Sequence, residues 1–374
     1  MEIKPPAPLT DVRNTPLYEE HLRLKALLAP FAGWNMPIHY GSILEEAKYT
    51  RKAVSIFDIS HMGEFIVKED PAAASLDRAV TIPVTKIKKG RCRYGFLLNE
   101  EGKILDDLIA YRIDDGTWML VVNACNEERD FATLAQRLAP GAGLENISAR
   151  TAKIDVQGPL SLEVVTGIAG DGVEKLTYFS FQAFPLLGGS SIISRTGYTG
   201  ELGFEIYIDS AKATELWREL LNHGAVRPAG LGARDILRLE MGLPLYGSEL
   251  TGDTTPLEAG LERFLDMDKD FTGRQALVEQ DRRGISRRLS GFIVDGRRTP
   301  RHGNRIIAGN RDAGFVTSGV FSPHLNSGIG MGYIDAELSG LGGDIAIAAG
   351  REEIRAKIAK LPFLRYTSLH GAEV

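Results

Sequence analysis

The stretch from residue 93 to residue 123, RYGFLLNEEGKILDDLIAYRIDDGTWMLVVN, constrains the fold more than any other part of the chain. It contains three apolar runs, and the two gaps between them (residues 99–102 and 114–116) are polar and end in glycine. Apolar runs separated by such turns predict an antiparallel meander of three strands, at residues 94–98, 104–113 and 118–122.

The middle strand of this meander carries two adjacent acids, Asp106 and Asp107. Because side chains alternate between the two faces of a strand, Asp107 falls in an apolar row with Leu105 and Ile109. Asp106 falls on the other face, with Arg112 and an expected route to solvent. A carboxylate in an apolar row needs hydrogen-bond partners or a raised pKa, which makes Asp107 a candidate site residue. The alternative is a carboxylate without function, satisfied by buried backbone N–H groups.

Composition limits the class of protein. The 374 residues are enough for two or three domains of about 150 residues each. The net charge of −5 argues against a general nucleic-acid binder, and no apolar run approaches the ~18 residues of a membrane span. The first residues have neither the apolar core of a signal peptide nor the arginine-rich character of a transit peptide, so a cytoplasmic location is expected.

Cysteine and histidine do not have the spacing of a metal or redox site, so no metal is expected. Cys92 and Cys125 are the only cysteines, and they are either a pair facing each other across the meander or two free thiols. A strand predicted over residues 55–67 is interrupted by Ser60 and His61. His61 either lines a pocket or is a structural histidine whose ring nitrogens are satisfied by hydrogen bonds.

The order of expected elements predicts separate domains. Residues 66–149 combine a strand, a helix, the meander and a second helix, and form a unit that carries Asp107. From residue 286 to residue 374, short apolar runs alternate with glycine turns, which predicts a β-barrel-like domain.

A glycine-rich hairpin is predicted over residues 191–208, SIISRTGYTGELGFEIYI. Gly197, Gly200 and Gly203 do not form a dinucleotide-binding fingerprint, because a strand rather than a helix follows them. Glycines in such a turn allow tight bends or the close approach of a ligand. Glu205 follows this turn, and it is either a substrate contact or a solvent-exposed side chain.

Arginines mark two further places. Arg234 lies at the start of a predicted helix, where the helix dipole disfavours a cation, so it is expected either to bind an anion or to pair with Asp235. Arginines are also dense between residues 282 and 305, where only Asp281 and Asp295 oppose them in the sequence. This run is either a solvated face or a surface for an acidic partner or an anionic ligand tail.

Several stretches, taken in order, resemble the aminomethyltransferase of the glycine cleavage system, the T-protein family. They are TPLY (15–18), PFAGW (30–34), FDISHM (57–62), GKILDDLI (102–109), GYTGELGFEI (197–206), AGLGARDILRLEMGLPLYG (229–247), TSGVFSPHLNSGIGMGYI (317–334) and KLPF (360–363). The resemblance runs through nearly the whole chain, and the ordered set is more specific than any single motif.

The resemblance implies an α+β fold of three domains, arranged as a cloverleaf around a central folate funnel, with antiparallel sheets and a C-terminal β-barrel-like domain. Residues 1–65 plus 150–275 are implied to form a discontinuous folate-binding core domain. The implied enzyme uses tetrahydrofolate as co-substrate and takes an aminomethyl group from the lipoyl arm of a partner, the H protein. It releases ammonia and makes 5,10-methylene-tetrahydrofolate.

The resemblance also implies site residues. The family's catalytic aspartate, the second acid of its pair, falls on Asp107, with the implied role of orienting and activating a folate nitrogen. The implied folate-binding positions are Met62, Tyr94, Tyr111, Asn123, Tyr198, Glu205 and Arg234, with a C-terminal contact at Arg365 or Tyr366. Two departures concern the lipoyl entrance, namely Phe264 where members often have tryptophan, and an acidic stretch at residues 262–270.

Two other functions remain open within the same fold. One is a folate-dependent demethylase that acts on another methyl or amine donor, because the donor side is the least constrained. The other is a non-catalytic folate-binding accessory protein of the kind tied to iron–sulfur maintenance. That subgroup carries a Lys-Gly-Cys-aromatic-x-Gly-Gln-Glu motif where this chain has DFTGRQ (270–275), without the cysteine.

Overall fold

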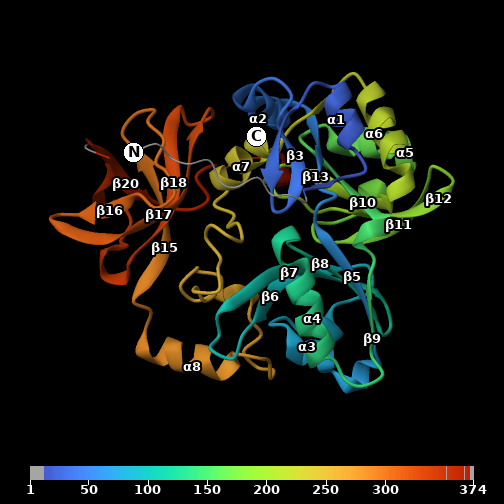
Figure 1. The fold of residues 1–374 in the computed structure, drawn as a ribbon, viewed down its shortest axis with the longest axis horizontal. Coiled ribbons are helices and arrows are strands. Elements are labelled where there is room, and N and C mark those ends of the chain that lie inside the picture. Colours follow the sequence, from blue (N-terminus) through green and yellow to red (C-terminus); the bar gives the residue numbers. More distant parts are fainter. Residues whose placement is uncertain (1–11, 351, 366, 371–374) are drawn as a thin grey trace.

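The computed structural model describes residues 12–350, 352–365 and 367–370. In Figure 1 this part of the chain forms three lobes, one drawn in teal, one in blue, green and yellow, and one in orange and red. Two of the lobes are built on open sheets, and the third is a closed barrel.

The teal lobe is built on an antiparallel five-stranded sheet with the strand order β6-β7-β8-β5-β9. Its strands are β5 (Gly63–Lys68), β6 (Cys92–Leu98), β7 (Ile104–Asp114), β8 (Thr117–Val122) and β9 (Gly143–Asn146). The predicted meander is confirmed, since β7 pairs antiparallel with both β6 and β8. Gly102 and Gly116, in the two turns, have φ values of 74° and 73°, in the left-handed region that favours glycine.

The two helices of this lobe decide which face of β7 is buried. They are α3 (Ser75–Ala79) and α4 (Glu127–Arg137), and Leu76 and Leu134 from them pack against Leu108 and Ala110 of β7. Asp106 shares the face of Leu108 and is 0% exposed. The predicted route from Asp106 to solvent is therefore wrong, because this face packs under the helices, and the opposite face of β7, with Asp107, stays partly accessible.

The second lobe contains a six-stranded sheet with the order β11-β12-β13-β10-β4-β14. Its strands are β4 (Val54–Asp58), β10 (Thr151–Gln157), β11 (Phe181–Leu186), β12 (Gly189–Ser194), β13 (Gly203–Asp209) and β14 (Val226–Pro228). β12 and β13 form the predicted hairpin, with Ile193 opposite Ile206. All neighbours are antiparallel except β14, which runs parallel to β4.

The two faces of this sheet differ in character. Ile154 and Ile206 lie on the face that packs against α5 (Ser161–Ala169) and α6 (Ala213–Asn222), visible at the outer side of the lobe in Figure 1. The opposite face carries a row of polar side chains that are almost inaccessible to solvent: Lys153, Asp155, Gln157 and Glu205. A buried polar row of this kind needs internal partners, which makes this face a candidate for a site.

Residues 55–67 form two strands rather than the single strand that the sequence predicts. β4 belongs to the six-stranded sheet and β5 to the five-stranded sheet, so the chain crosses between the two sheets at residues 59–62. The Asp58 carboxylate accepts the backbone N–H of Ser60 at 2.9 Å and turns the chain at the end of β4. His61 and Met62 therefore lie at the junction of the two sheets.

A small sheet and two helices complete the second lobe. The sheet is β1 (Arg13–Asn14), β3 (Trp34–His39) and β2 (Leu27–Phe31), with α1 (Tyr18–Arg23) between β1 and β2 in the chain. The helices α2 (Ile43–Lys52) and α7 (Leu231–Glu240) pack with Phe57 and Ile59. α2 begins after Ser42, whose hydroxyl caps the helix by accepting the backbone N–H of Glu45 at 3.4 Å.

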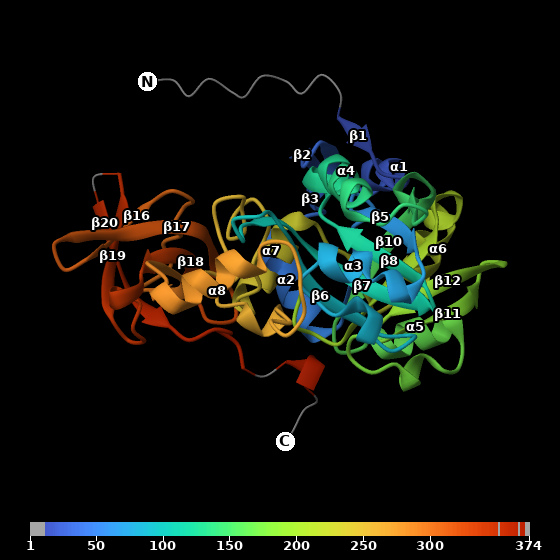
Figure 2. The ribbon, with the colours of Figure 1, turned by 90° about the horizontal axis from the view of Figure 1, so that it is seen from below.

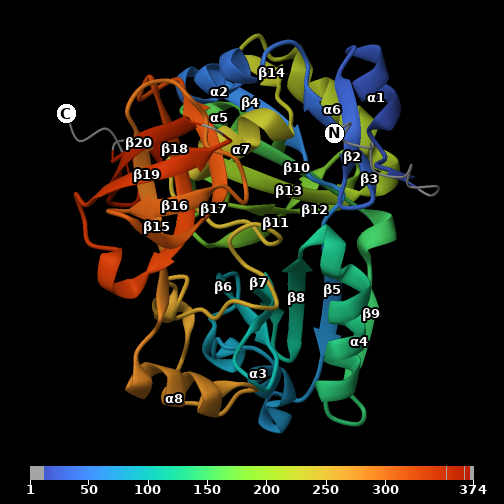
Figure 3. The same ribbon diagram turned by 60° about the vertical axis from the view of Figure 1, so that its left-hand side comes forward.

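The C-terminal lobe is a closed barrel, with the strand order β15-β18-β17-β16-β19-β20. Its strands are β15 (Arg287–Val294), β16 (Arg305–Ala308), β17 (Arg311–Ser322), β18 (Ser327–Asp335), β19 (Asp344–Ala349) and β20 (Glu352–Ala359), and α8 (Arg274–Arg283) precedes them. α7 lies between the barrel and the six-stranded sheet in Figures 2 and 3, and Leu239 of α7 packs against Ile329 and Met331 of the barrel.

The predicted α+β class, with antiparallel sheets and a C-terminal barrel, is confirmed. The predicted domain limits, 1–65 plus 150–275, 66–149 and 286–374, stay predictions. None of the helices in the described ranges is both long and apolar enough to cross a lipid bilayer.

Candidate functional site

Asp107 is held by donors from its two neighbouring strands. The Tyr94 hydroxyl, on β6, donates to Oδ2 at 2.9 Å, and the Asn123 amide Nδ2, just after β8, donates to Oδ1 at 2.8 Å. These donors are side chains, whereas the non-functional alternative predicted backbone N–H groups. Each carboxylate oxygen keeps lone-pair capacity for a further partner.

The pKa of Asp107 suits proton exchange near neutrality. Burial raises this pKa to about 7, the nearby Asp106 carboxylate adds to the rise, and the hydrogen bonds from Tyr94 and Asn123 oppose it. Asp107 is partly exposed and Asp106 is fully buried, so of the two acids only Asp107 is accessible to a substrate. A carboxyl with a pKa near the working pH is suited to accept and return a proton.

Glu205 lies on the buried polar face of the six-stranded sheet. Its Oε1 is 3.0 Å from Lys153 Nζ, and the Thr196 hydroxyl donates to Oε2. Burial works to raise the pKa of Glu205, but the charge of Lys153, the hydrogen bonds from Thr196 and Lys153 and the charge of Arg234 together hold this pKa below its ordinary value. Glu205 is 4% exposed, so the solvent-exposed alternative is wrong.

Lys153 brings Glu205 together with two other predicted residues. Its Nζ lies 3.7 Å from the sulfur of Met62 and 5.0 Å from the centre of the Tyr207 ring. The hydroxyls of Tyr207 and Tyr111 are 2.9 Å apart, and Tyr111 is fully buried. Tyr111 comes from the meander and Tyr207 from the six-stranded sheet, so the two sheets meet at this point.

Arg234 reaches the same polar face from α7. Its Nη1 donates to Asp155 Oδ2 at 2.7 Å, and its Cζ lies 4.9 Å from the centre of the Tyr198 ring. Asp155 is directly opposite Glu205 in the β10–β13 pair. Arg234 therefore connects Tyr198 to the carboxylates of the polar face.

The predicted pairing of Arg234 with Asp235 is wrong. Adjacent residues of a helix point about 100° apart, so their side chains do not face each other. Asp235 instead accepts a hydrogen bond from Arg238 Nε at 2.8 Å, three residues further along the helix.

The C-terminal predictions are only partly placed. Arg365 is exposed, and Tyr366 lies outside the described residues. The backbone N–H groups of Phe363 and Leu364 donate to the Glu240 carbonyl at 2.9 and 3.2 Å, so this segment lies at the end of α7. In the described part of the chain, no hydrogen bond joins Arg365 to another of the predicted site residues.

The structure decides between the alternatives for Cys92 and Cys125 but not between those for His61. Both cysteines are free thiols, so the pairing across the meander is wrong. His61 is 6% exposed and packs edge-on against Phe31, and burial lowers its pKa to about 4, so it is neutral at pH 7. Its Nδ1 has no hydrogen-bond partner among the described residues, so it is buried without being fully satisfied.

Sequence reasoning missed Lys153 and Asp155. Both alternate with Ala152, Ile154 and Val156 in β10, a pattern that normally indicates a strand with one solvated face. The available signal was their position two and four residues before Gln157, on the same face of the strand that ends at the Gly158 turn. Nothing local shows that this face is covered. Phe264, in contrast, borders the site, with its ring centroid 4.8 Å from that of Tyr94.

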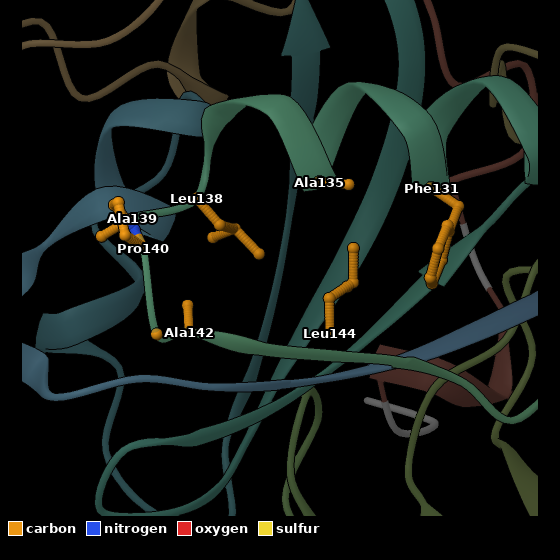
Figure 4. A pocket seen from close by; sticks show the side chains of 8 residues that line it. Phe131, Ala135, Leu138, Ala139, Pro140, Ala142 and Leu144 are labelled. Carbon is orange, nitrogen blue, oxygen red and sulfur yellow. The ribbon is translucent and has the colours of Figure 1, made fainter.

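Two cavities in the described part of the chain lie away from these residues. One, of about 440 Å³, lies between α4 and β9, where Phe131, Leu138 and Leu144 point toward one another in Figure 4. The other, of about 460 Å³, is lined by the loop at residues 270–273 and by Arg78 and Arg137. No cluster of three or more His, Cys, Asp or Glu side chains suited to a metal ion occurs within the described ranges.

Two family models match this chain, one over the two lobes with open sheets and one over the barrel. Residues 17–269 match the sequence family described as GCVT N-terminal domain, and residues 287–364 match the Glycine cleavage T-protein C-terminal barrel domain. An aminomethyltransferase of Caldanaerobacter subterraneus subsp. tengcongensis is 39% identical over 363 residues, which cover 96% of this chain and 97% of the relative. An aminomethyltransferase of Halothermothrix orenii is 41% identical over 357 residues, which cover 94% and 100%.

A solved structure shows the same fold. The crystal structure of glycine cleavage system aminomethyltransferase T from Bartonella henselae matches with a TM-score of 0.90 and 34% identity, covering 95% of this chain and 99% of that chain. These similarities favour an aminomethyltransferase and give no support to a demethylase or an accessory protein. The chain belongs to the glycine cleavage T-protein family of aminomethyltransferases.

Proposed function

We propose that this aminomethyltransferase binds tetrahydrofolate between the meander and the polar face of the six-stranded sheet. It transfers the one-carbon unit of an aminomethyl-lipoyl H protein to tetrahydrofolate, with release of ammonia. The observation that carries the proposal is Asp107, an accessible carboxyl with a pKa of about 7, held by Tyr94 and Asn123.

The residues of the polar face fit a reduced pterin. Glu205 is an ionised acceptor, and a carboxylate accepts two parallel N–H bonds of the kind that an amino-pyrimidine edge offers. Met62 is partly exposed and supplies apolar surface beside it, while Tyr111, which is fully buried, supports the site through its hydrogen bond with Tyr207. Arg234 and Tyr198 would contact the ligand from the α7 side, and Arg365 or Tyr366 would add the C-terminal contact.

Asp107 supplies the reacting carboxyl. It orients the attacking nitrogen of the folate through a hydrogen bond, and it accepts a proton as that nitrogen gains positive charge. Tyr94 and Asn123 hold the carboxylate in place, so little reorganisation is needed during the reaction. Partial burial strengthens the interaction of the carboxylate with positive charge relative to water.

Ammonia release tests this function. The protein is mixed with H protein whose lipoyl group carries the aminomethyl unit, with and without tetrahydrofolate, and ammonia is measured. We expect ammonia to form rapidly only when tetrahydrofolate is present. A protein that binds tetrahydrofolate but forms no ammonia from this donor would point instead to the demethylase or the accessory protein.

Replacing Glu205 by alanine is expected to weaken tetrahydrofolate binding by about 1–3 kcal/mol, a ~5–150-fold rise in Kd. The variant removes the acceptor and leaves the Lys153 ammonium without its partner. Titration calorimetry measures the Kd, and circular dichroism checks the fold. Glu163→Ala, at an exposed position on α5 of the same lobe, is the matched control. An unchanged Kd for folded Glu205→Ala and Glu205→Gln would remove Glu205 from the folate site.

The arginine run is the proposed docking surface for the H protein. Several members already have acidic partners from outside the run: Arg287 with Glu258 at 2.9 Å, Arg305 with Asp312 at 2.6 Å, and Arg298 with Glu352. Asp281 and Asp295 are the only acids near the run in the sequence, and the fold brings these further acids to it. Arg297 is exposed and lies over the Phe321 ring, 4.5 Å from its centre.

Charge reversal at Arg297 and Arg298 is expected to raise the KM for H protein and to leave kcat nearly unchanged. Charges at the rim of a protein–protein interface mainly affect the rate at which the two proteins associate. Steady-state kinetics at low and high salt measure both constants. The matched control is Lys175→Glu with Lys212→Glu, two exposed lysines on the second lobe. An equal KM in both double variants would assign the arginine run to solvated surface.

The cytoplasmic location stays a prediction.

A further inference from the structure

Asp130, on α4, is a buried acid that the proposed reaction does not use. It is 0% exposed, and neither of its carboxylate oxygens accepts a hydrogen bond from an N–H or hydroxyl group of the described residues. The nearest cation is Arg129, whose Nε lies 3.6 Å from Oδ1, beyond hydrogen-bond length. The Arg129 guanidinium donates instead to the Leu105 carbonyl and the Tyr246 hydroxyl. An ionised carboxylate without a donor is costly in such a place, so Asp130 requires a proton.

Asp106 has the opposite surroundings. Its Oδ1 accepts hydrogen bonds from Asn123 Nδ2 at 2.8 Å and Asn126 Nδ2 at 2.7 Å, and its Oδ2 accepts the Asn123 backbone N–H at 2.9 Å. Burial raises the pKa of Asp106 well above its ordinary value, and the charge and hydrogen bond of Asp130 add to the rise. Burial also raises the pKa of Asp130 above its ordinary value, against the hydrogen bond with Asp106 and the charge of Arg129, which lower it. Two carboxyls in contact at a dry site cannot both ionise easily, so the pair retains one proton.

Asn123 connects this pair to the reacting carboxyl. Its Nδ2 lies within hydrogen-bond distance of Asp106 Oδ1 and Asp107 Oδ1, both at 2.8 Å, and of the Asp107 carbonyl at 3.2 Å. A single amide group therefore contacts both carboxylates. Its position, and with it the hydrogen bond that orients Asp107, depends on the charge that Asp106 carries.

We propose that Asp106 and Asp130 share one proton and together hold the Asn123 amide against Asp107, as positioning residues for the proposed reaction. The shared proton lies on Asp130 and is donated to Asp106, because the Asp106 oxygens already accept three N–H groups and those of Asp130 accept none. Loss of this proton leaves two buried negative charges, which draw the amide toward Asp106 and disfavour the ionised form of Asp107. The inference rests on the proposed function, since Asp107 must be the reacting group.

The groups that face the pair come from four places. They are Asp107 on β7, Arg129 on α4, Cys125 in the turn before α4, and Tyr246 in the loop after α7. Arg129 is the cation of this set. Its charge lowers the pKa of Asp130, but its Nη2 is engaged by Leu105 and Tyr246 and its Nε lies 3.6 Å from Oδ1, so it opposes the shared proton without replacing it.

The test compares Asp130→Ala with Asp130→Asn. The alanine variant lacks a donor to Asp106, and we expect its kcat to fall by at least ~10-fold with the KM for tetrahydrofolate changed less than about twofold, since a small misplacement of a reacting group is costly. The asparagine variant restores a donor that cannot ionise. We expect it to recover most of the lost kcat and to lack the alkaline decline of kcat that the unmodified enzyme shows when the shared proton is lost.

Asp106→Asn and Glu128→Ala complete the set. Asp106→Asn removes the charge that helps to raise the pKa of Asp107. The acidic limb of the kcat–pH profile of this variant should therefore move to lower pH. This shift can be measured even if Asp130→Ala does not fold. Glu128→Ala, at an exposed position on the same helix, should match the unmodified enzyme. An unchanged pH profile in Asp130→Asn and Asp106→Asn would overturn the inference. If the unmodified enzyme forms no ammonia at all, it is the proposed function that fails.

Discussion

An Asp107→Asn variant is expected to lose at least ~10²-fold in kcat, while its fold and its affinity for tetrahydrofolate stay nearly unchanged. The asparagine has the same shape, and its amide group has a partner on each side. In the native protein, Asn123 Nδ2 and the Tyr94 oxygen lie 2.8 and 2.9 Å from the two carboxylate oxygens. In the variant, the asparagine carbonyl oxygen accepts from Asn123 Nδ2, and its amide nitrogen donates to the Tyr94 oxygen. The variant loses only the negative charge and the capacity to take up a proton.

Ammonia release under saturating H protein measures this loss, and calorimetry measures the binding of tetrahydrofolate. Asp114→Asn is the matched control, because Asp114 is an exposed carboxylate at the end of the same strand, paired with Lys89 at 2.9 Å. Turnover of Asp107→Asn equal to that of the control would exclude Asp107 from the reaction.

The pH dependence of the unmodified enzyme gives a second check on Asp107. The pKa of this carboxyl is raised to about 7, so it is protonated below that pH and ionised above it. Because the ionised form is the one that accepts a proton, kcat should rise with pH through about 7. The Asp107→Asn variant should not show this rise.

Arg238→Ala is expected to lower the free energy of unfolding by about 3–5 kcal/mol, the typical result of removing one partner of a buried ion pair. Arg238, on α7, is 2% exposed, and its Nη1 donates to Glu249 Oε2 at 2.7 Å. Its Nη2 donates to the Ser318 hydroxyl at 2.7 Å, on strand β17 of the barrel. The substitution leaves the fully buried Glu249 without its cation and breaks a bond between α7 and the barrel.

Urea denaturation monitored by fluorescence measures this change. Asp235→Ala is the matched control, because Asp235 is the other acidic partner of Arg238 but its side chain is 43% exposed. Removing an exposed partner typically costs less than about 1 kcal/mol. Equal losses in the two variants would show that the buried Arg238–Glu249 pair contributes no more to stability than the exposed Arg238–Asp235 pair.

A large part of the fold was predictable because it is local. Turn residues between alternating apolar runs predicted the meander and the hairpin, and Glu127–Arg137 is a helix as its amphipathic pattern indicates. The prediction over residues 55–67 was wrong because the Asp58 carboxylate turns the chain there, and one apparent strand is shared between two sheets.

The candidate site was predictable to a smaller degree. Strand alternation singled out Asp107, the glycine-rich turn pointed to Glu205 and the helix start to Arg234. The other site residues came from the resemblance to the T-protein family. Alternation placed Asp106 and Asp107 on opposite faces correctly, but it assigned solvent to the wrong face. The helices that cover Asp106 lie elsewhere in the sequence, at residues 75–79 and 127–137.

Which residues share a face and where the chain turns could be predicted because both depend on neighbours within a few residues, and the family could be predicted from motifs spread along the chain. Which face is covered and which charges are paired could be seen only once the lobes were packed together. Lys153 with Glu205 and Arg234 with Asp155 are pairs of residues far apart in the chain, brought together where two sheets and a helix meet. The pairing and the pKa values of these residues depend on burial and on charges a few ångströms away. Both conditions arise only when the lobes pack together.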